Sequence, residues 1–132
     1  MTQSEDEKKT SLRRILIVED EPFIALTLED MLSELGYAVA GSVAQVGDAI
    51  ELLEHEEVDG ALLDVNLGNQ KIDPVADWLA ARSLPFIFTT GYGRSGVPTG
   101  HANRPVLEKP FRMDDLSAIL RSEFGATGAN PD

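Results

Sequence analysis

Charged and hydroxyl side chains stand at the ends of four short strand-like runs in this sequence. They are Glu19 and Asp20 after residues 15–18, Asp64 at the end of 60–64, Thr90 after 86–89, and Lys109 after 105–108. Ligand sites in open parallel α/β sheets form outside the carboxyl ends of the strands. We therefore expect these carboxylates, the hydroxyl and the ammonium to converge at one edge of a sheet.

The three carboxylates would repel one another at such short range and raise each other's pKa. A divalent cation relieves this repulsion, and Mg²⁺ prefers hard oxygen ligands such as Asp20, Asp64 and a backbone carbonyl just after Asp64. Lys109 adds a positive charge suited to a phosphoryl group, and Thr90 offers a hydroxyl donor. The set fits phosphoryl transfer, with Asp64 as the nucleophile that forms an acyl phosphate.

Strand-like runs alternate with helical patterns along the chain, which implies a parallel sheet with right-handed crossovers. The expected strands cover residues 15–18, 37–43, 60–64, 86–89 and 105–108, and the expected helices cover 22–35, 46–54, 74–82 and 113–124. Five strands in a chain of this length indicate an α/β fold. We predict a flavodoxin-like three-layer sandwich with a five-stranded parallel sheet of order 2-1-3-4-5.

The stretch 91–104 is the weakest part of this pattern, because it holds four glycines and Pro98 where a fourth regular helix would usually lie. We expect it to be short, irregular or mobile. Two histidines, His55 and His101, have no ligand spacing and are interpreted as surface residues. Three aromatic residues are interpreted as core; they are Trp78, Phe86 and Phe88.

Length and composition indicate one folded domain at residues 12–124, with a flexible arm at 1–11 and a flexible tail at 125–132. A net charge of −12 argues against direct nucleic-acid binding, which needs a basic face. The chain has no cysteine, which excludes disulfides. No apolar run approaches the roughly 20 residues that span a bilayer. We expect a cytoplasmic protein without nucleic-acid or membrane partners.

Four motifs at these strand ends make the sequence resemble a response-regulator receiver domain of two-component signalling. They are Ile15-Leu16-Ile17-Val18-Glu19-Asp20-Glu21-Pro22, Leu62-Leu63-Asp64-Val65-Asn66-Leu67, Thr90-Gly91 and Glu108-Lys109-Pro110-Phe111. Each motif alone is weak, but the four in this order, each at a predicted strand end, are highly specific. The resemblance covers about residues 13–123.

The resemblance implies a role for each residue that matches a motif. Asp64 matches the phosphorylated aspartate, Asp20 the principal Mg²⁺ carboxylate, Glu19 its acidic neighbour, Asn66 the residue whose main-chain carbonyl binds the metal, Thr90 the switch hydroxyl, and Lys109 the lysine that bonds the phosphoryl group. The bond between Lys109 and Pro110 resembles a cis peptide of the family.

Two positions depart from the family pattern. Many receivers carry an aromatic switch residue three places before the lysine, where this chain has Val106. The stretch 85–93 is similar to the "FATGUY" subgroup of single-domain receivers, with Thr89 where the subgroup has alanine. The resemblance to that subgroup implies that the partner is an HWE/HisKA2-type histidine kinase. It also implies a loose fourth helix, which members of the subgroup tend to have.

The first functional hypothesis is a single-domain response regulator, monomeric or weakly dimeric, that accepts phosphate from a histidine kinase with Mg²⁺. It would be a phosphoacceptor with slow autodephosphorylation rather than an ordinary enzyme, acting through phosphorylation-dependent protein contacts or as a phosphate sink. Phosphorylation would shift a two-state surface around residues 91–111.

Three alternatives remain open from the residues. A metal-dependent phosphatase of the haloacid-dehalogenase kind would need a second aspartate two places after Asp64, where Asn66 stands. A nucleotide or flavin binder would need a glycine-rich loop after the first strand, where the acidic run 19–21 stands. A receiver-like module that no longer takes phosphate would not need the intact acidic set with Lys109.

Overall fold

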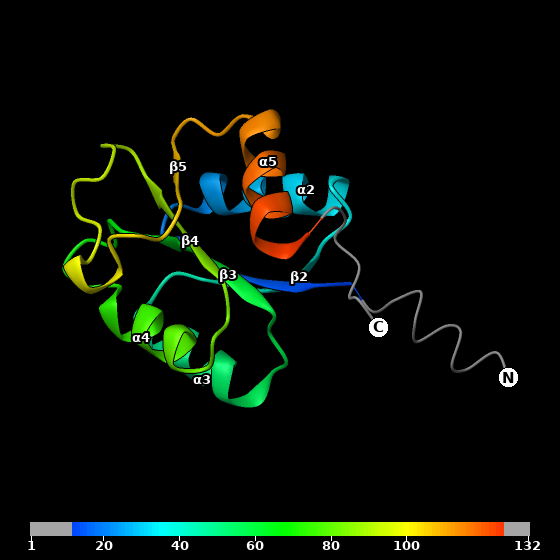
Figure 1. The fold of residues 1–132 in the computed structure, drawn as a ribbon. Coiled ribbons are helices and arrows are strands. Elements are labelled where there is room, and N and C mark those ends of the chain that lie inside the picture. Colours follow the sequence, from blue (N-terminus) through cyan, green and yellow to red (C-terminus); the bar gives the residue numbers. More distant parts are fainter. Residues whose placement is uncertain (1–11, 126–132) are drawn as a thin grey trace, which may run out of the picture.

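The computed structural model describes residues 12–125, so the arm predicted at 1–11 and the tail beyond Gly125 lie outside the described residues. A sheet of five strands lies between two helical layers (Figure 1). Helices α2 (Pro22–Glu34) and α5 (Met113–Phe124) cover one face, and α3 (Val46–His55) and α4 (Asp73–Ala81) cover the other. None of the described helices is long and apolar enough to cross a bilayer.

The five strands are all parallel and lie in the order β2-β1-β3-β4-β5, which confirms the predicted flavodoxin-like topology. They are β1 (Arg14–Val18), β2 (Ala38–Val43), β3 (Gly60–Asp64), β4 (Phe86–Thr90) and β5 (Val106–Glu108). Every residue of β3 and β4 is buried. Strands that are covered on both faces read as continuous apolar runs, which is why the sequence located them well.

Alternate residues of the strands pack into two separate cores. Ile17, Leu62, Ile87 and Leu107 lie in the core beneath α2 and α5. Leu16, Leu63, Phe86 and Phe88 lie in the core against α3 and α4. Because successive side chains of a strand point to opposite faces, this division fixes the face of each polar residue at the strand ends.

The observed elements begin and end within one residue of the predicted bounds. Helix α4 starts at Asp73, with Pro74 in its first turn, where the missing N–H of proline leaves no bond unmade. Strand β4 extends to Thr90, because Thr90 pairs with Glu108 of β5.

Residues 91–105 contain one 3₁₀ turn, Thr99–His101, in place of a regular helix, as the glycines predicted. His101 is not the surface residue that we expected: its side chain is 13% exposed, and its Nε2 lies 2.7 Å from Asp77 Oδ1 of α4. Its ring also packs edge-on against Phe86, with the ring centroids 5.5 Å apart. The segment is therefore irregular but attached to the domain by side chains.

The three aromatic residues predicted to be core differ in their burial. Phe86 and Phe88 are fully buried and pack edge to face with centroids 5.5 Å apart. Trp78 is only partly buried, and the Arg82 guanidinium lies 3.5 Å from its ring centroid. A cation over an indole ring tolerates solvent, so Trp78 closes the edge of the core rather than filling it.

Gly60 opens β3 where no larger side chain fits. A Cβ atom at this position would lie 2.7 Å from the carbonyl oxygen of Pro85 and would collide with the Phe124 ring of α5. We predict that Gly60→Ala lowers the free energy of unfolding by about 1–3 kcal/mol, because overpacking forces the strand or the ring to shift. Urea denaturation measures this change.

Gly47→Ala is the matched control, because a Cβ at Gly47 in helix α3 meets nothing within 4 Å. Within a helix, alanine is more favourable than glycine by up to about 1 kcal/mol. The control should therefore leave stability unchanged or raise it. Equal stability of the Gly60→Ala variant and the wild type would contradict the close packing of α5 against β3.

Candidate functional site

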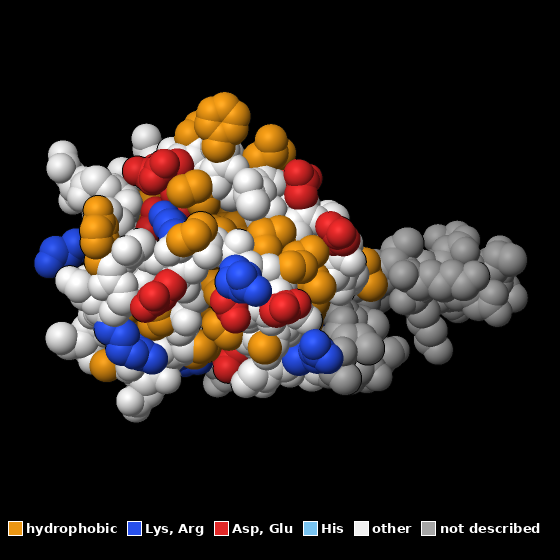
Figure 2. Space-filling view, turned by 90° about the horizontal axis from the view of Figure 1, so that it is seen from above, with side chains coloured by type: hydrophobic (Ala, Val, Ile, Leu, Met, Phe, Trp, Pro, Cys, Tyr) orange, Lys and Arg blue, Asp and Glu red, His pale blue; other side chains and the backbone are white. Residues whose placement is uncertain are grey.

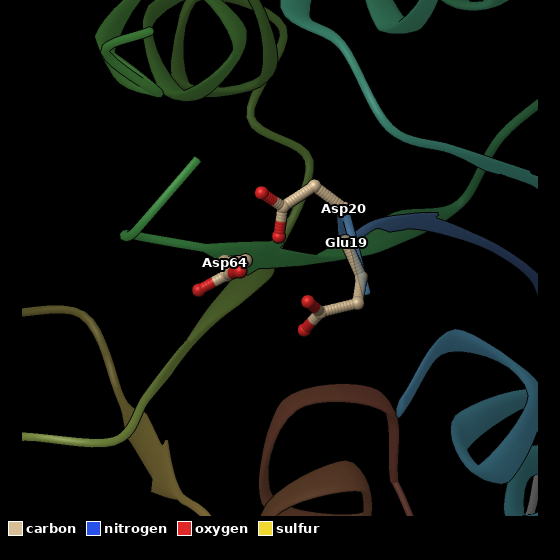
Figure 3. Close-up of side chains that lie close together, drawn as sticks. All are labelled: Glu19, Asp20 and Asp64. Atoms are coloured by element: carbon tan, nitrogen blue, oxygen red, sulfur yellow. The ribbon is translucent and has the colours of Figure 1, made fainter. Parts of the chain in front are cut away.

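Three carboxylates converge at the carboxyl end of the sheet. Glu19 and Asp20 directly follow β1, and Asp64 is the last residue of β3. One oxygen from each of the three lies within 4.8 Å of the others, and Figure 3 shows the side chains reaching towards a common space. Glu19 and Asp64 are buried, at 3% and 1% exposure, whereas Asp20 is exposed. The cluster therefore combines two carboxylates in the protein interior with one that reaches solvent.

Lys109 supplies the positive charge of the site. Its Nζ lies 3.2 Å from Glu19 Oε1 and 3.5 Å from Asp64 Oδ1. The amide of Lys109 donates to the Thr90 carbonyl at 2.8 Å, and the peptide bond between Lys109 and Pro110 is cis, as the resemblance implied. Burial pulls the pKa of Lys109 down, but the charges of Asp64 and Glu19 outweigh burial and hold the pKa above its usual value.

Glu19 has a strongly shifted ionisation. Burial, helped by the nearby charge of Asp64, raises the pKa of Glu19 to about 7, although the Glu21 amide and Lys109 act in the opposite direction. The Glu21 N–H donates to Glu19 Oε2 at 3.1 Å. Among the described residues, three carboxylates face one ammonium at this edge of the sheet, so positive charge is in deficit, which a bound cation relieves.

The residues present fit a hard divalent cation. The buried Oδ2 of Asp64 has no hydrogen-bond partner in the described part of the chain, while Oδ1 accepts the Asn66 N–H at 3.0 Å. The ligand atoms near this oxygen belong to carboxylates, which are the hard oxygen ligands that Mg²⁺ prefers. Mg²⁺ usually fills its remaining positions with water. Asn66 is exposed and lies in the loop after β3.

Thr90 ends β4 beside this cluster and is fully buried. Its Oγ1 accepts the N–H of Tyr92 at 3.0 Å, a local turn that sequence reasoning did not anticipate. Threonine hydroxyls commonly bond the amide two residues on, but the sequence alone does not show which of several threonines does so. In this conformation the Thr90 hydroxyl is engaged by its own loop.

A cavity of about 560 Å³ opens beside the site, between α2 and the loops that follow β4 and β5. Its lining includes Ile24, Asn66, Tyr92, Lys109 and Phe111. Helix α2 also carries Phe23 and Leu26, which are 84% and 53% exposed. Figure 2, seen from the side of α2 and α5, shows apolar side chains beside acidic ones on this face. The site thus adjoins a surface on which large apolar side chains are accessible.

The structure brings together the residues that the strand ends predicted. Four charged residues, Glu19, Asp20, Asp64 and Lys109, form one cluster, and Asn66 lines the adjoining cavity. Thr90 lies at the end of the neighbouring strand, with its hydroxyl hydrogen-bonded to the Tyr92 N–H.

Val106 stands where many receivers have an aromatic switch residue. Its side chain is partly buried and packs against the core below α3 and α4.

Comparison with known proteins agrees with this geometry. The sequence profile of the family described as "Response regulator receiver domain" matches residues 15–121, most of the described chain. The chain therefore belongs to the response-regulator receiver family, which confirms the resemblance drawn from the four motifs.

Individual relatives fall in the same family. Two solved structures are described as SdrG from Sphingomonas melonis Fr1 and the BeF3-activated conformation of SdrG from Pseudomonas melonis Fr1. The first is 46% identical, covers 86% of this chain and 97% of that one, and has a TM-score of 0.77. The second is 45% identical over the same shares, with a TM-score of 0.73.

A curated relative, the phyllosphere-induced regulator PhyR of Methylorubrum extorquens, is 34% identical over 80% of this chain and 41% of its own length. The transcriptional regulatory protein PdtaR of Mycobacterium tuberculosis is 31% identical, over 79% of this chain and 53% of its own length. The chain thus spans about half the length of these two curated relatives.

The shifted pKa of Glu19 gives a test of the cluster's electrostatics. Because the pKa rises from 4.5 to about 7 on folding, the folded protein binds an extra proton between these pH values and loses stability as pH rises through them. We predict that the metal-free wild type loses about 3 kcal/mol relative to Glu19→Gln between pH 4 and pH 8. Urea denaturation with a chelator measures the difference.

Glu54→Gln serves as the control, since Glu54 is an exposed carboxylate of α3. This variant should follow the wild type at every pH. If the stability difference between wild type and Glu19→Gln does not change with pH, Glu19 is not held in the electrostatic environment described above.

Proposed function

We propose that this protein is a response regulator that accepts a phosphoryl group on Asp64 from a phosphohistidine of a histidine kinase. The phosphorus–nitrogen bond of the phosphohistidine breaks, a phosphorus–oxygen bond forms at Asp64, and the released imidazole takes up a proton from solvent. The observation that carries this proposal is the buried Asp64, one oxygen of which has no hydrogen bond within the described residues, close to two further carboxylates and to Lys109. A carboxylate nucleophile beside the Lys109 ammonium suits a reaction governed by charge and position.

The resident cation in this proposal is Mg²⁺, held by Asp20, Asp64 and the main-chain carbonyl of Asn66, with Glu19 close by. When bound, Mg²⁺ would neutralise charge on the phosphoryl oxygens and on the carboxylates. The Lys109 ammonium would move partly away from the carboxylates and bind a phosphoryl oxygen, because ammonium groups bind phosphate oxygens well. Thr90 would exchange its bond with the Tyr92 amide for a bond to a phosphoryl oxygen.

The output is a protein contact that depends on phosphorylation, or the removal of phosphate from a pathway as a sink. A change at Thr90 passes directly to residues 91–105, because its hydroxyl holds the Tyr92 amide at the start of that segment. The kinase would be of the HWE/HisKA2 type, and the protein would work in the cytoplasm as a monomer or weak dimer. The BeF3-activated conformation described for SdrG supports switching in a relative that is 45% identical.

The remaining alternatives make different chemical demands. A haloacid-dehalogenase-like phosphatase would need a general acid two places after the nucleophile, and the amide side chain of Asn66 cannot act as one. A silent receiver-like module would have no use for a free buried oxygen on Asp64 beside Lys109.

The proposal predicts that a small phosphodonor with Mg²⁺ converts the wild type to one band of lower mobility in a phosphate-retarding gel. Asp64→Asn should give no such band, because an amide cannot form the acyl phosphate, while Asp48→Asn, at an exposed aspartate of α3, should still give it. A shifted band in the Asp64→Asn protein would contradict Asp64 as the acceptor. Steady turnover of a generic phosphoester would favour a phosphatase, and no shift with any donor or kinase would favour a silent module.

A further inference from the structure

Thr89 occupies the same row of the sheet as the acidic site. In the parallel register Asp64 of β3 pairs with Thr89 of β4, and Thr89 pairs with Leu107 of β5. Ile87, two residues before Thr89, lies in the core beneath α2 and α5, together with Leu62, which stands two residues before Asp64. The alternation of strand side chains therefore places Thr89 and Asp64 on the same face of the sheet, as neighbours across the strands.

The side chain of Lys109 must pass over strand β4 to reach its partners. Lys109 directly follows β5, whereas its partner oxygens belong to Asp64 at the end of β3 and to Glu19 after β1. Strand β4 lies between β5 and β3. Leu107, two residues before Lys109, lies in the core beneath α2 and α5, so the lysine stem passes over β4 on the face that carries Thr89.

The buried hydroxyl of Thr89 lacks a hydrogen-bond partner in the described part of the chain. Thr89 is 1% exposed, and its Oγ1 makes no hydrogen bond within residues 12–125. A buried hydroxyl without a partner costs free energy, and such groups call for an explanation in a native structure. The Lys109 ammonium has three donors, and the structure directs it at two acceptors, one on Glu19 and one on Asp64.

We propose that Thr89 is a positioning residue for Lys109, with its Oγ1 as a third acceptor for the ammonium. The inference rests on the proposed function, in which Lys109 contacts the phosphoryl group on Asp64. When Lys109 turns from the carboxylates towards that group, Thr89 holds the ammonium over β4 and keeps it aligned. An alanine, as in the subgroup that this stretch resembles, has no oxygen for this role.

Thr89→Val and Thr89→Ser separate the hydroxyl from the shape of the side chain. Valine keeps the volume and removes the oxygen, whereas serine keeps the oxygen and removes the methyl group. With a small phosphodonor and Mg²⁺, Thr89→Val should be phosphorylated about five- to tenfold more slowly than wild type, the effect of one lost hydrogen bond. Thr89→Ser should retain the wild-type rate within about twofold. Thr99→Val, at an exposed threonine of the 3₁₀ turn, is the control.

A second readout does not depend on phosphorylation. The ¹⁵Nζ resonance of Lys109, assigned by its loss in Lys109→Arg, should shift in metal-free Thr89→Val and stay near its wild-type position in Thr89→Ser. Wild-type rate and resonance in Thr89→Val would overturn the proposal, as would a Thr89→Ser protein as slow as Thr89→Val. If the wild type itself takes no phosphate, the proposed function fails, and the Lys109 resonance alone then decides whether Thr89 holds the ammonium.

Discussion

The burial of two carboxylates beside a third at one end of the sheet is the constraint on which the site depends. One oxygen from each lies within 4.8 Å of the others, two of the side chains are buried, and Lys109 faces them. Burial raises the pKa of Glu19 to about 7, a sign that the protein alone does not fully compensate these charges. The arrangement is therefore suited to a cation and a phosphoryl group that bring the compensation from outside.

The parallel sheet makes this concentration of charge sustainable. Strands β1, β3 and β4 are packed between two helical layers, so the backbone at the strand ends is held by cores on both faces. The unfavourable burial of charge at the site is thereby offset by the apolar packing of the two cores, a common relation between function and stability. The same packing fixes the row in which Asp64 and Thr89 stand side by side.

Much of this could be predicted from the sequence, because buried parallel strands are visible as apolar runs and their last residues mark the site. Glu19, Asp64 and Lys109 were found in this way. The contact between His101 and Asp77 could not be, since these residues are 24 positions apart and only tertiary packing brings the irregular segment onto α4. The register of β4 against β3 could not be predicted from the sequence either. From the sequence, Thr89 was therefore only a position where the related subgroup has alanine.

The most direct measurement is a crystal structure of the protein grown with Mg²⁺ and BeF₃⁻, a mimic of a phosphoryl group. We expect the metal between the carboxylates of Asp20 and Asp64 and the main-chain carbonyl of Asn66, with beryllium bonded to an Asp64 oxygen and the Lys109 ammonium bonded to a fluoride. A structure with Mg²⁺ elsewhere, and with Asp64 still paired only to Lys109 and the Asn66 amide, would contradict it.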